Sequence, residues 1–156
     1  MARFWMLLFP LALSACGAKV TALPDAEELT IADQGAQGKI GGGAWKVLAG
    51  KAEDAGDSFS VTLYGEALAD ACADDSAATG DRVLLSLPKT VSTVDVDITK
   101  LQVITMVDMP DAMNYVSGAG KMAVTAVSAT EVSGGLVASF NEDNEVNGKF
   151  TIPVCP

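Results

Sequence analysis

The sequence has no histidine, few aromatic residues (6%) and only 10 basic residues against 20 acidic ones. Without histidine, the Ser-His-Asp and Cys-His catalytic triads, histidine-ligated zinc and the usual near-neutral general base are excluded. The acidic balance disfavours nucleic acid and anionic lipid headgroups as direct partners, because both carry like charge. A length of 156 residues fits one domain. No motif in the chain calls for a cofactor, so none is predicted.

Long apolar runs are also scarce, and the clearest one is at the amino terminus. Phe4 to Leu13 is a ten-residue apolar run that follows Arg3. As a helix it would span about 15 Å, half of a hydrocarbon core of about 30 Å, so it is too short for an ordinary membrane span. The run therefore predicts an export signal over residues 1–15.

The end of this run, Leu13-Ser14-Ala15-Cys16, resembles the lipobox of bacterial lipoproteins. The resemblance implies cleavage before Cys16, a diacylglyceryl group on its sulfur, and often an acyl group on its nitrogen. Two or three long chains hold a protein firmly on a membrane, whereas one chain holds it marginally. Gly17, rather than an aspartate, follows the cysteine and favours the outer membrane over the inner membrane. The alternative is a plain secretory signal that leaves Cys16 unmodified.

Two cysteines remain after Cys16, and they predict a disulfide. An even pair in an exported domain usually forms a bridge, so we expect Cys72 to pair with Cys155. Two free thiols or mixed pairing are the alternatives. Loss of residues 1–15 would remove Arg3 and no acid, which leaves 9 basic and 20 acidic residues and a formal net charge of −11.

Residues 16–38 and residues 39–156 differ in composition. The first segment is small and charged and contains Pro24, so we expect a flexible stalk behind the lipidated cysteine, with an r.m.s. reach of about 25 Å. A turn of helix from Asp25 is the alternative. The domain is predicted to occupy residues 39–156.

Period-two alternation of apolar and polar residues dominates this domain. It predicts half-buried strands over 58–64, 93–98, 121–126 and 146–154. Residues 82–87 and 101–107 are apolar on both faces, which predicts central strands covered on each side. Glycine, proline and asparagine turn signals recur about every ten residues, so we predict a single antiparallel β-sandwich or open barrel. The alanine-rich stretch 66–78 is the one helix candidate, and its aspartates and Gly80 favour a loop.

Two acidic runs could offer oxygen ligands to calcium. One is Asn141 to Glu145, and the other is formed by Asp70, Asp74 and Asp75 around Cys72. Calcium needs six to eight oxygens, and neither run has the spaced ligands and central glycine of an EF-hand loop. We therefore predict no metal site, with an acidic hairpin tip in the first run and a solvated loop in the second. Calcium-dependent adhesion is kept as an alternative function.

The closing segment, residues 131–156, looks like the last hairpin of small uncharacterised β-rich bacterial lipoproteins. This resemblance supports the fold and implies no activity. The sequence as a whole predicts a lipid-anchored, non-enzymatic binding or structural module of the cell envelope, with a protein partner. A carboxylate-based hydrolase of envelope glycans is the alternative from another class, because the chain is rich in acids.

Overall fold

The computed structural model describes residues 29–73 and 78–156, which form an all-β domain. The described residues contain no α-helix, only one 3₁₀ turn, η1, at Ile98–Lys100. The strands are β1 (Gln37–Ile40), β2 (Gly43–Lys46), β3 (Ala49–Asp54), β4 (Ser58–Tyr64), β5 (Arg82–Pro88), β6 (Ser92–Asp95), β7 (Ile104–Asp108), β8 (Met113–Val116), β9 (Ala119–Val127), β10 (Glu131–Asn141) and β11 (Asn144–Cys155). The predicted fold class is confirmed.

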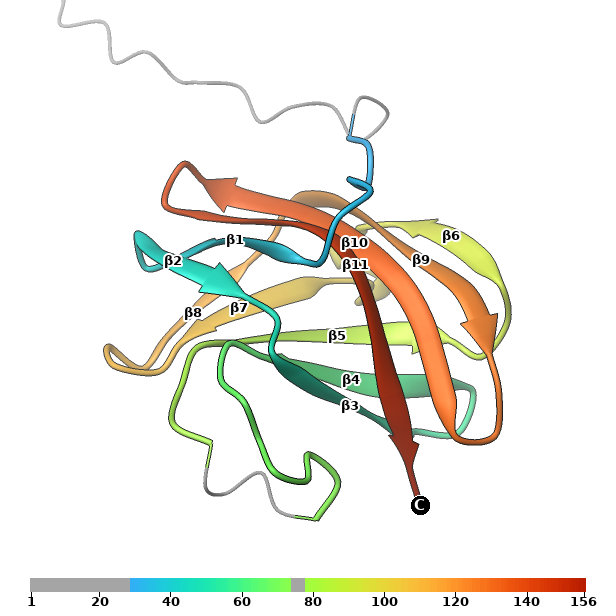
Figure 1. Ribbon diagram of the computed structural model, residues 1–156. Coiled ribbons are helices and arrows are strands. Elements are labelled where there is room, and N and C mark those ends of the chain that lie inside the picture. The colour runs from blue at the N-terminus through green and yellow to red at the C-terminus, as the bar shows by residue number, and fades with distance from the viewer. Residues whose placement is uncertain (1–28, 74–77) are drawn as a thin grey trace, which may run out of the picture.

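The strands form one sheet that curls into an open barrel (Figure 1). The strand order is β6-β9-β10-β11-β3-β4-β5-β7-β8, and the pairing is antiparallel except between β11 and β3. That parallel contact is short, with Val154 opposite Ala52 and Cys155 opposite Glu53. The earlier part of the same β11 edge pairs with β1, and β1 pairs with β2. Along this edge, β11 therefore pairs with the amino-terminal hairpin and, near its end, with β3.

The core fills the concave side of the sheet, because alternate residues of each strand point inward. In β4, Phe59, Val61 and Leu63 face the core, as the alternation predicts. In β11 the inward residues include Val146, Phe150 and Ile152, also as predicted. Other large core side chains are Ile40, Trp45, Val83, Leu87, Ile104, Met106, Met122 and Leu136.

Three strand predictions need correction. The 93–98 strand ends at Asp95, and Ile98 lies in the exposed η1 turn. The 101–107 strand begins only at Ile104, because Leu101 takes a left-handed conformation after the turn. Ala126 is exposed although Met122 and Val124 are buried.

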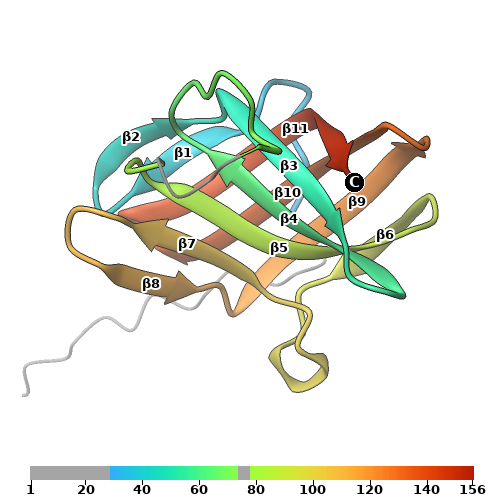
Figure 2. The same ribbon diagram turned by 90° about the horizontal axis from the view of Figure 1, so that it is seen from below.

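The prediction that the 82–87 strand is covered on both faces is also wrong, whereas the outer residues of β7, Thr105 and Val107, are half-buried. In β5, Val83, Leu85 and Leu87 are buried, whereas Leu84 and Ser86 on the other face are exposed. The sheet curls around one core, and among the described residues no second layer covers the convex side of β5 (Figure 2). Apolar residues on the outer face of β5 are therefore surface residues, which soluble proteins commonly tolerate.

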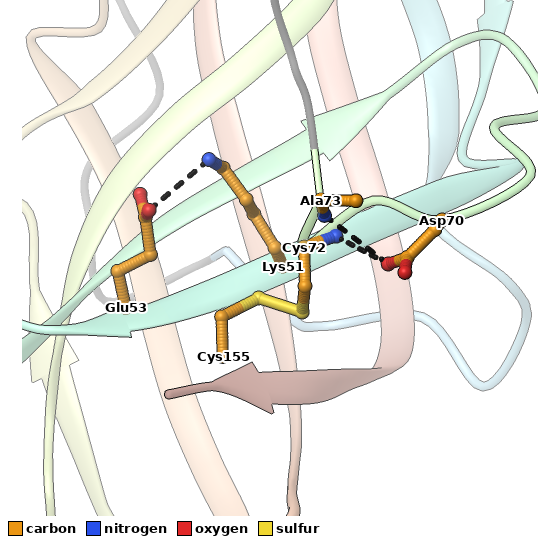
Figure 3. Close-up of a disulfide and its surroundings, with 6 residues drawn as sticks. All are labelled: Lys51, Glu53, Asp70, Cys72, Ala73 and Cys155. Atoms are coloured by element: carbon orange, nitrogen blue, oxygen red, sulfur yellow. Dashed lines mark hydrogen bonds and ion pairs between the residues drawn. A yellow bond between two sulfur atoms is a disulfide. The ribbon is translucent and has the colours of Figure 1, made fainter.

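The predicted disulfide between Cys72 and Cys155 is present, with the two Cα atoms 5.4 Å apart (Figure 3). It ties the β4–β5 connection to the last residue of β11. Lys51 lies next to the bridge, and its ammonium forms an ion pair of 3.1 Å with Glu53. The described part of the 66–78 stretch has neither helix nor strand, as expected for a loop.

The amino-terminal boundary of the folded part lies before residue 39. Ala36 is fully buried, and the backbone N–H of Lys149 donates to the carbonyl of Gln34 over 2.7 Å. Residues 30–38, which the composition assigns to the stalk, are therefore part of the domain. The predicted signal over residues 1–15 and the predicted lipidation site Cys16 lie outside the described residues. No helix among the described residues is long and apolar enough to cross a membrane.

Candidate functional site

The β1–β2 turn is held against the β10–β11 turn. Gly41 and Gly42 form the two-residue loop of the first hairpin, with φ of +59° and +79°, a backbone that glycine adopts without steric cost. The N–H of Gly41 donates to Oδ1 of Asn144 over 2.8 Å, and the N–H of Gly42 donates to the carbonyl of Asp143 over 3.0 Å. These bonds fix the amino-terminal hairpin on the closing hairpin.

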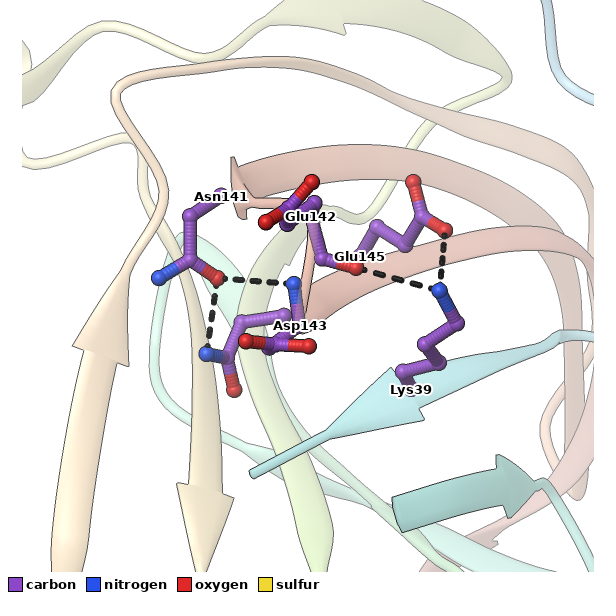
Figure 4. Close-up of polar contacts among 6 residues, drawn as sticks. Lys39, Asn141, Glu142, Asp143 and Glu145 are labelled. Atoms are coloured by element: carbon purple, nitrogen blue, oxygen red, sulfur yellow. Dashed lines mark hydrogen bonds and ion pairs between the residues drawn. The ribbon is translucent and has the colours of Figure 1, made fainter. Parts of the chain in front are cut away.

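In the acidic turn of the closing hairpin, side-chain oxygens of Asn141, Asn144 and Glu145 contact other groups of the protein. Oδ1 of Asn141 accepts hydrogen bonds from the N–H of Asp143 and from the amide of Asn144, and Lys39 lies beside Glu145 with an N–O distance of 3.7 Å (Figure 4). The Lys39 ammonium also donates to the carbonyl of Glu142. The run from Asn141 to Glu145 is thus the predicted hairpin tip.

In the second acidic run, around Cys72, Asp70 is among the described residues. Oδ1 of Asp70 accepts hydrogen bonds from the backbone N–H groups of Cys72 and Ala73, which closes a local turn. Asp74 and Asp75 lie outside the described residues. Within the described residues, no group of three or more cysteine, aspartate or glutamate side chains is placed to hold a metal ion.

Residues 30–33 contact the outward-facing side chains of β11, and residues 34–36 pair with the backbone of Lys149 in the same strand. The N–H of Ala32 donates to Oδ1 of Asn147, and the amide nitrogen of Asn147 donates to the carbonyl of Thr30. Lys149 forms an ion pair of 2.7 Å with Asp33, and the hydrogen bond from Lys149 holds the pKa of Asp33 below its usual range. Gly148 permits the close approach, because a Cβ there would lie 2.8 Å from the backbone of Ala36.

A groove of about 880 Å³ lies between this segment and the β1–β2 hairpin. Its lining mixes amides, apolar side chains and one charge of each sign, contributed by Leu29, Gln34, Gln37, Gly38, Ala44, Trp45, Lys46, Leu48, Gly65, Val137, Ala138, Ser139, Glu145, Val146 and Asn147. The volume falls in the range of ordinary ligand sites. The sequence does not predict this groove, because the residues that line it are far apart in the chain and no motif marks them.

The groove is lined by amides, apolar side chains, Lys46 and Glu145. Of the described residues that line it, Glu145 is the one carboxylate, and it faces Lys39 rather than a second acid. Glycoside hydrolysis needs two carboxyl groups that converge on one bond. Gln37 and Lys46 are exposed on neighbouring strands. The Gln37 amide can donate and accept hydrogen bonds, the Lys46 ammonium can donate them, and Leu48 offers apolar contact.

A smaller hollow of about 500 Å³ beside β6 is lined by two aspartates, Asp95 and Asp97. Asp97 is committed to the η1 turn, where its Oδ1 accepts from the hydroxyl and the N–H of Thr99 over 2.6 and 2.9 Å. Hydrogen bonds from Thr99 and then Lys100 lower the pKa of Asp97 to about 2. A carboxyl group with this pKa stays ionised and is unsuited to the role of general acid near neutral pH.

Lys89 and Trp45 make polar contacts within the fold. Ser86 is exposed on β5, and Lys89, three positions later, forms an ion pair with Asp54 and lies over the Phe59 ring. The buried Trp45 donates from its indole N–H to the carbonyl of Asp81. Comparison of the chain with protein families, with curated proteins and with solved structures gives no match.

Proposed function

We propose that this chain is a lipid-anchored protein of the bacterial cell envelope, attached through Cys16, which binds a protein partner in the groove beside β1. The lipobox-like residues Leu13 to Cys16 support the anchor. The disulfide between Cys72 and Cys155 supports export, because such bridges persist in oxidising compartments and are rare in the cytosol. Gly17 favours the outer membrane as the destination.

The groove carries the binding part of this proposal. An extended peptide presents backbone donors and acceptors together with side chains of mixed polarity. The amides of Gln34 and Gln37, the ammonium of Lys46 and the exposed Leu48 side chain supply matching groups around one hollow. The formal charge of −11 after cleavage leaves the covalent lipid, rather than charge attraction, to hold the domain at the membrane.

The anchor is tested by detergent phase partitioning of the full-length chain expressed in a bacterium. We expect the protein in the detergent phase and its Cys16→Ser variant in the aqueous phase. Mass spectrometry of the mature protein should show an acylated Cys16 as the first residue. Equal aqueous partitioning of both forms would refute the anchor.

The binding site is tested by cross-linking and capture from membranes that contain the lipidated protein. Gln37→Arg places a long charged side chain at an exposed position in the groove, and Ser86→Arg makes the same change at an exposed position of β5 outside it. We expect Gln37→Arg to lose the captured protein and Ser86→Arg to retain it. Identical capture by both variants would contradict the proposed site.

A further inference from the structure

The β6–β7 connection holds two large aliphatic side chains in solvent. Ile98 is 63% exposed and Leu101 is 80% exposed, the highest value among the large hydrophobic residues of the described chain. Ile98 is the first residue of the η1 turn and Leu101 is its C-cap, and this segment projects from the sheet between β6 and β7 (Figure 2). Isolated exposed aliphatics are common on protein surfaces, but two on one short turn form a small apolar tip.

The turn is rigidly built, so the exposure does not follow from a lack of structure. The N–H of Asp97 donates to the carbonyl of Gln102 over 2.8 Å, and the N–H of Gln102 donates back over 3.0 Å. The carboxylate of Asp97 caps the turn at Thr99. Leu101 has φ of 57°, a conformation that is uncommon for residues other than glycine, asparagine and aspartate. These bonds hold both aliphatic side chains away from the core.

The tip carries little net charge of its own. Lys100 and Asp97 form an ion pair of 3.0 Å, so one positive and one negative group offset each other beside the two aliphatic side chains. The stem of a lysine can also lie along an apolar surface while its ammonium stays in water. This composition suits the interfacial region of a zwitterionic bilayer, and the strongly acidic character of the rest of the chain does not extend to the tip.

The proposed anchor would keep this tip close to a bilayer. Twelve residues separate Cys16 from Leu29, and fully extended they span about 45 Å. A short tether raises the effective concentration of the domain at the surface to the millimolar range, so a weak contact suffices to orient it. We propose that the Ile98–Leu101 turn inserts its two aliphatic side chains into the bilayer to which Cys16 anchors the chain. This inference rests on the lipid anchor proposed above.

Depth-dependent fluorescence quenching tests the contact in vesicles of phosphatidylcholine with brominated acyl chains. The lipidated full chain is reconstituted as the Ile98→Trp variant and as a matched Val91→Trp control, since Val91 is 68% exposed on the separate β5–β6 connection. The buried Trp45 gives a common background. We expect brominated lipid to quench Ile98→Trp about twofold more than Val91→Trp.

A second variant separates membrane contact from general proximity. Leu101→Asn removes the other aliphatic side chain, and asparagine tolerates the left-handed conformation, so the turn is retained. Adding Leu101→Asn to Ile98→Trp should reduce the quenching toward that of Val91→Trp. Equal quenching of all three variants in vesicle-bound protein would overturn the inserted turn and leave the anchor standing. Failure of the full chain to bind vesicles at all would remove the anchor and this inference with it.

Discussion

Oδ1 of Asn144 accepts a hydrogen bond of 2.8 Å from the backbone N–H of Gly41, which lies 103 positions earlier in the chain. Asn144 is almost completely buried, and its own amide donates to Asn141. One side chain therefore joins the turn of the first hairpin to the turn of the last. The β1–β2 hairpin forms one side of the proposed groove, so this bond also holds the groove in shape.

Asn144→Ala should destabilise the domain by about 2 kcal/mol, because it leaves the N–H of Gly41 without its acceptor. Urea denaturation followed by circular dichroism measures the change. Asn114→Ala, at an exposed position of the edge strand β8, is the control and should change stability by less than about 0.5 kcal/mol. Equal effects of the two substitutions would show that the link between the hairpins contributes nothing.

Gly148→Ala should be strongly unfavourable, at about 2 kcal/mol or more. Gly148 has φ of +137°, and a Cβ would meet backbone atoms of Gln34 and Ala36 at 2.7 and 2.8 Å. Gly35→Ala, in the segment that packs against it, is the matched control, because a Cβ there meets nothing within 4 Å. Thermal unfolding of both variants should separate them, and a Gly148→Ala protein as stable as Gly35→Ala would be inconsistent with this packing.

Removal of the disulfide should cost about 4 kcal/mol, because the bridge joins residues 83 positions apart and restricts the unfolded chain. Chemical denaturation of the wild-type protein with and without a reductant measures the effect. The Cys72→Ser/Cys155→Ser variant should match the reduced wild type and should not respond to the reductant. Identical wild-type curves under the two conditions would argue against a stabilising bridge.

The η1 turn should lose its cap only in strong acid. Hydrogen bonds from Thr99 and Lys100 lower the pKa of Asp97 from 3.8 to about 2 in the folded chain. Because the folded pKa is depressed, the contribution of this carboxylate to stability is complete above 3.8 and is lost as the pH falls through about 2. The NMR shift of the Thr99 amide should titrate with a midpoint of about 2, and Asp97→Asn should abolish the step. A midpoint at the ordinary value would show that the cap is not formed.

The sequence predicts the buried face of a strand correctly where apolar and polar residues alternate. Phe59, Val61 and Leu63 alternate with hydroxyl residues, and the structure buries them as expected. Leu84 and Leu101 are equally apolar, yet both are exposed, because hydropathy does not report how many layers cover a strand. The alternation predicts a strand that includes Ile98, because it does not reveal the cap that Asp97 makes at Thr99.

The groove could not be predicted from the sequence. Its walls come from residues 29–48, from Gly65 and from β10 and β11, and no local motif relates these segments. The folded domain begins before the predicted boundary at residue 39 for the same reason. Residues 30–36 have the composition of a linker, but they are fixed by hydrogen bonds to Asn147 and Lys149 that only the folded chain brings within reach.

The amino-acid sequence by itself determined the all-β class, the positions of the main strands and the identity of the two cysteines that pair. These features follow from local periodicity, turn residues and cysteine count, which are properties of short stretches of chain or of composition. Tertiary structure decided which apolar residues are exposed, where the folded domain begins and how the groove is formed. Those outcomes depend on contacts between segments up to 117 positions apart, such as Thr30 with Asn147, and no local pattern encodes them.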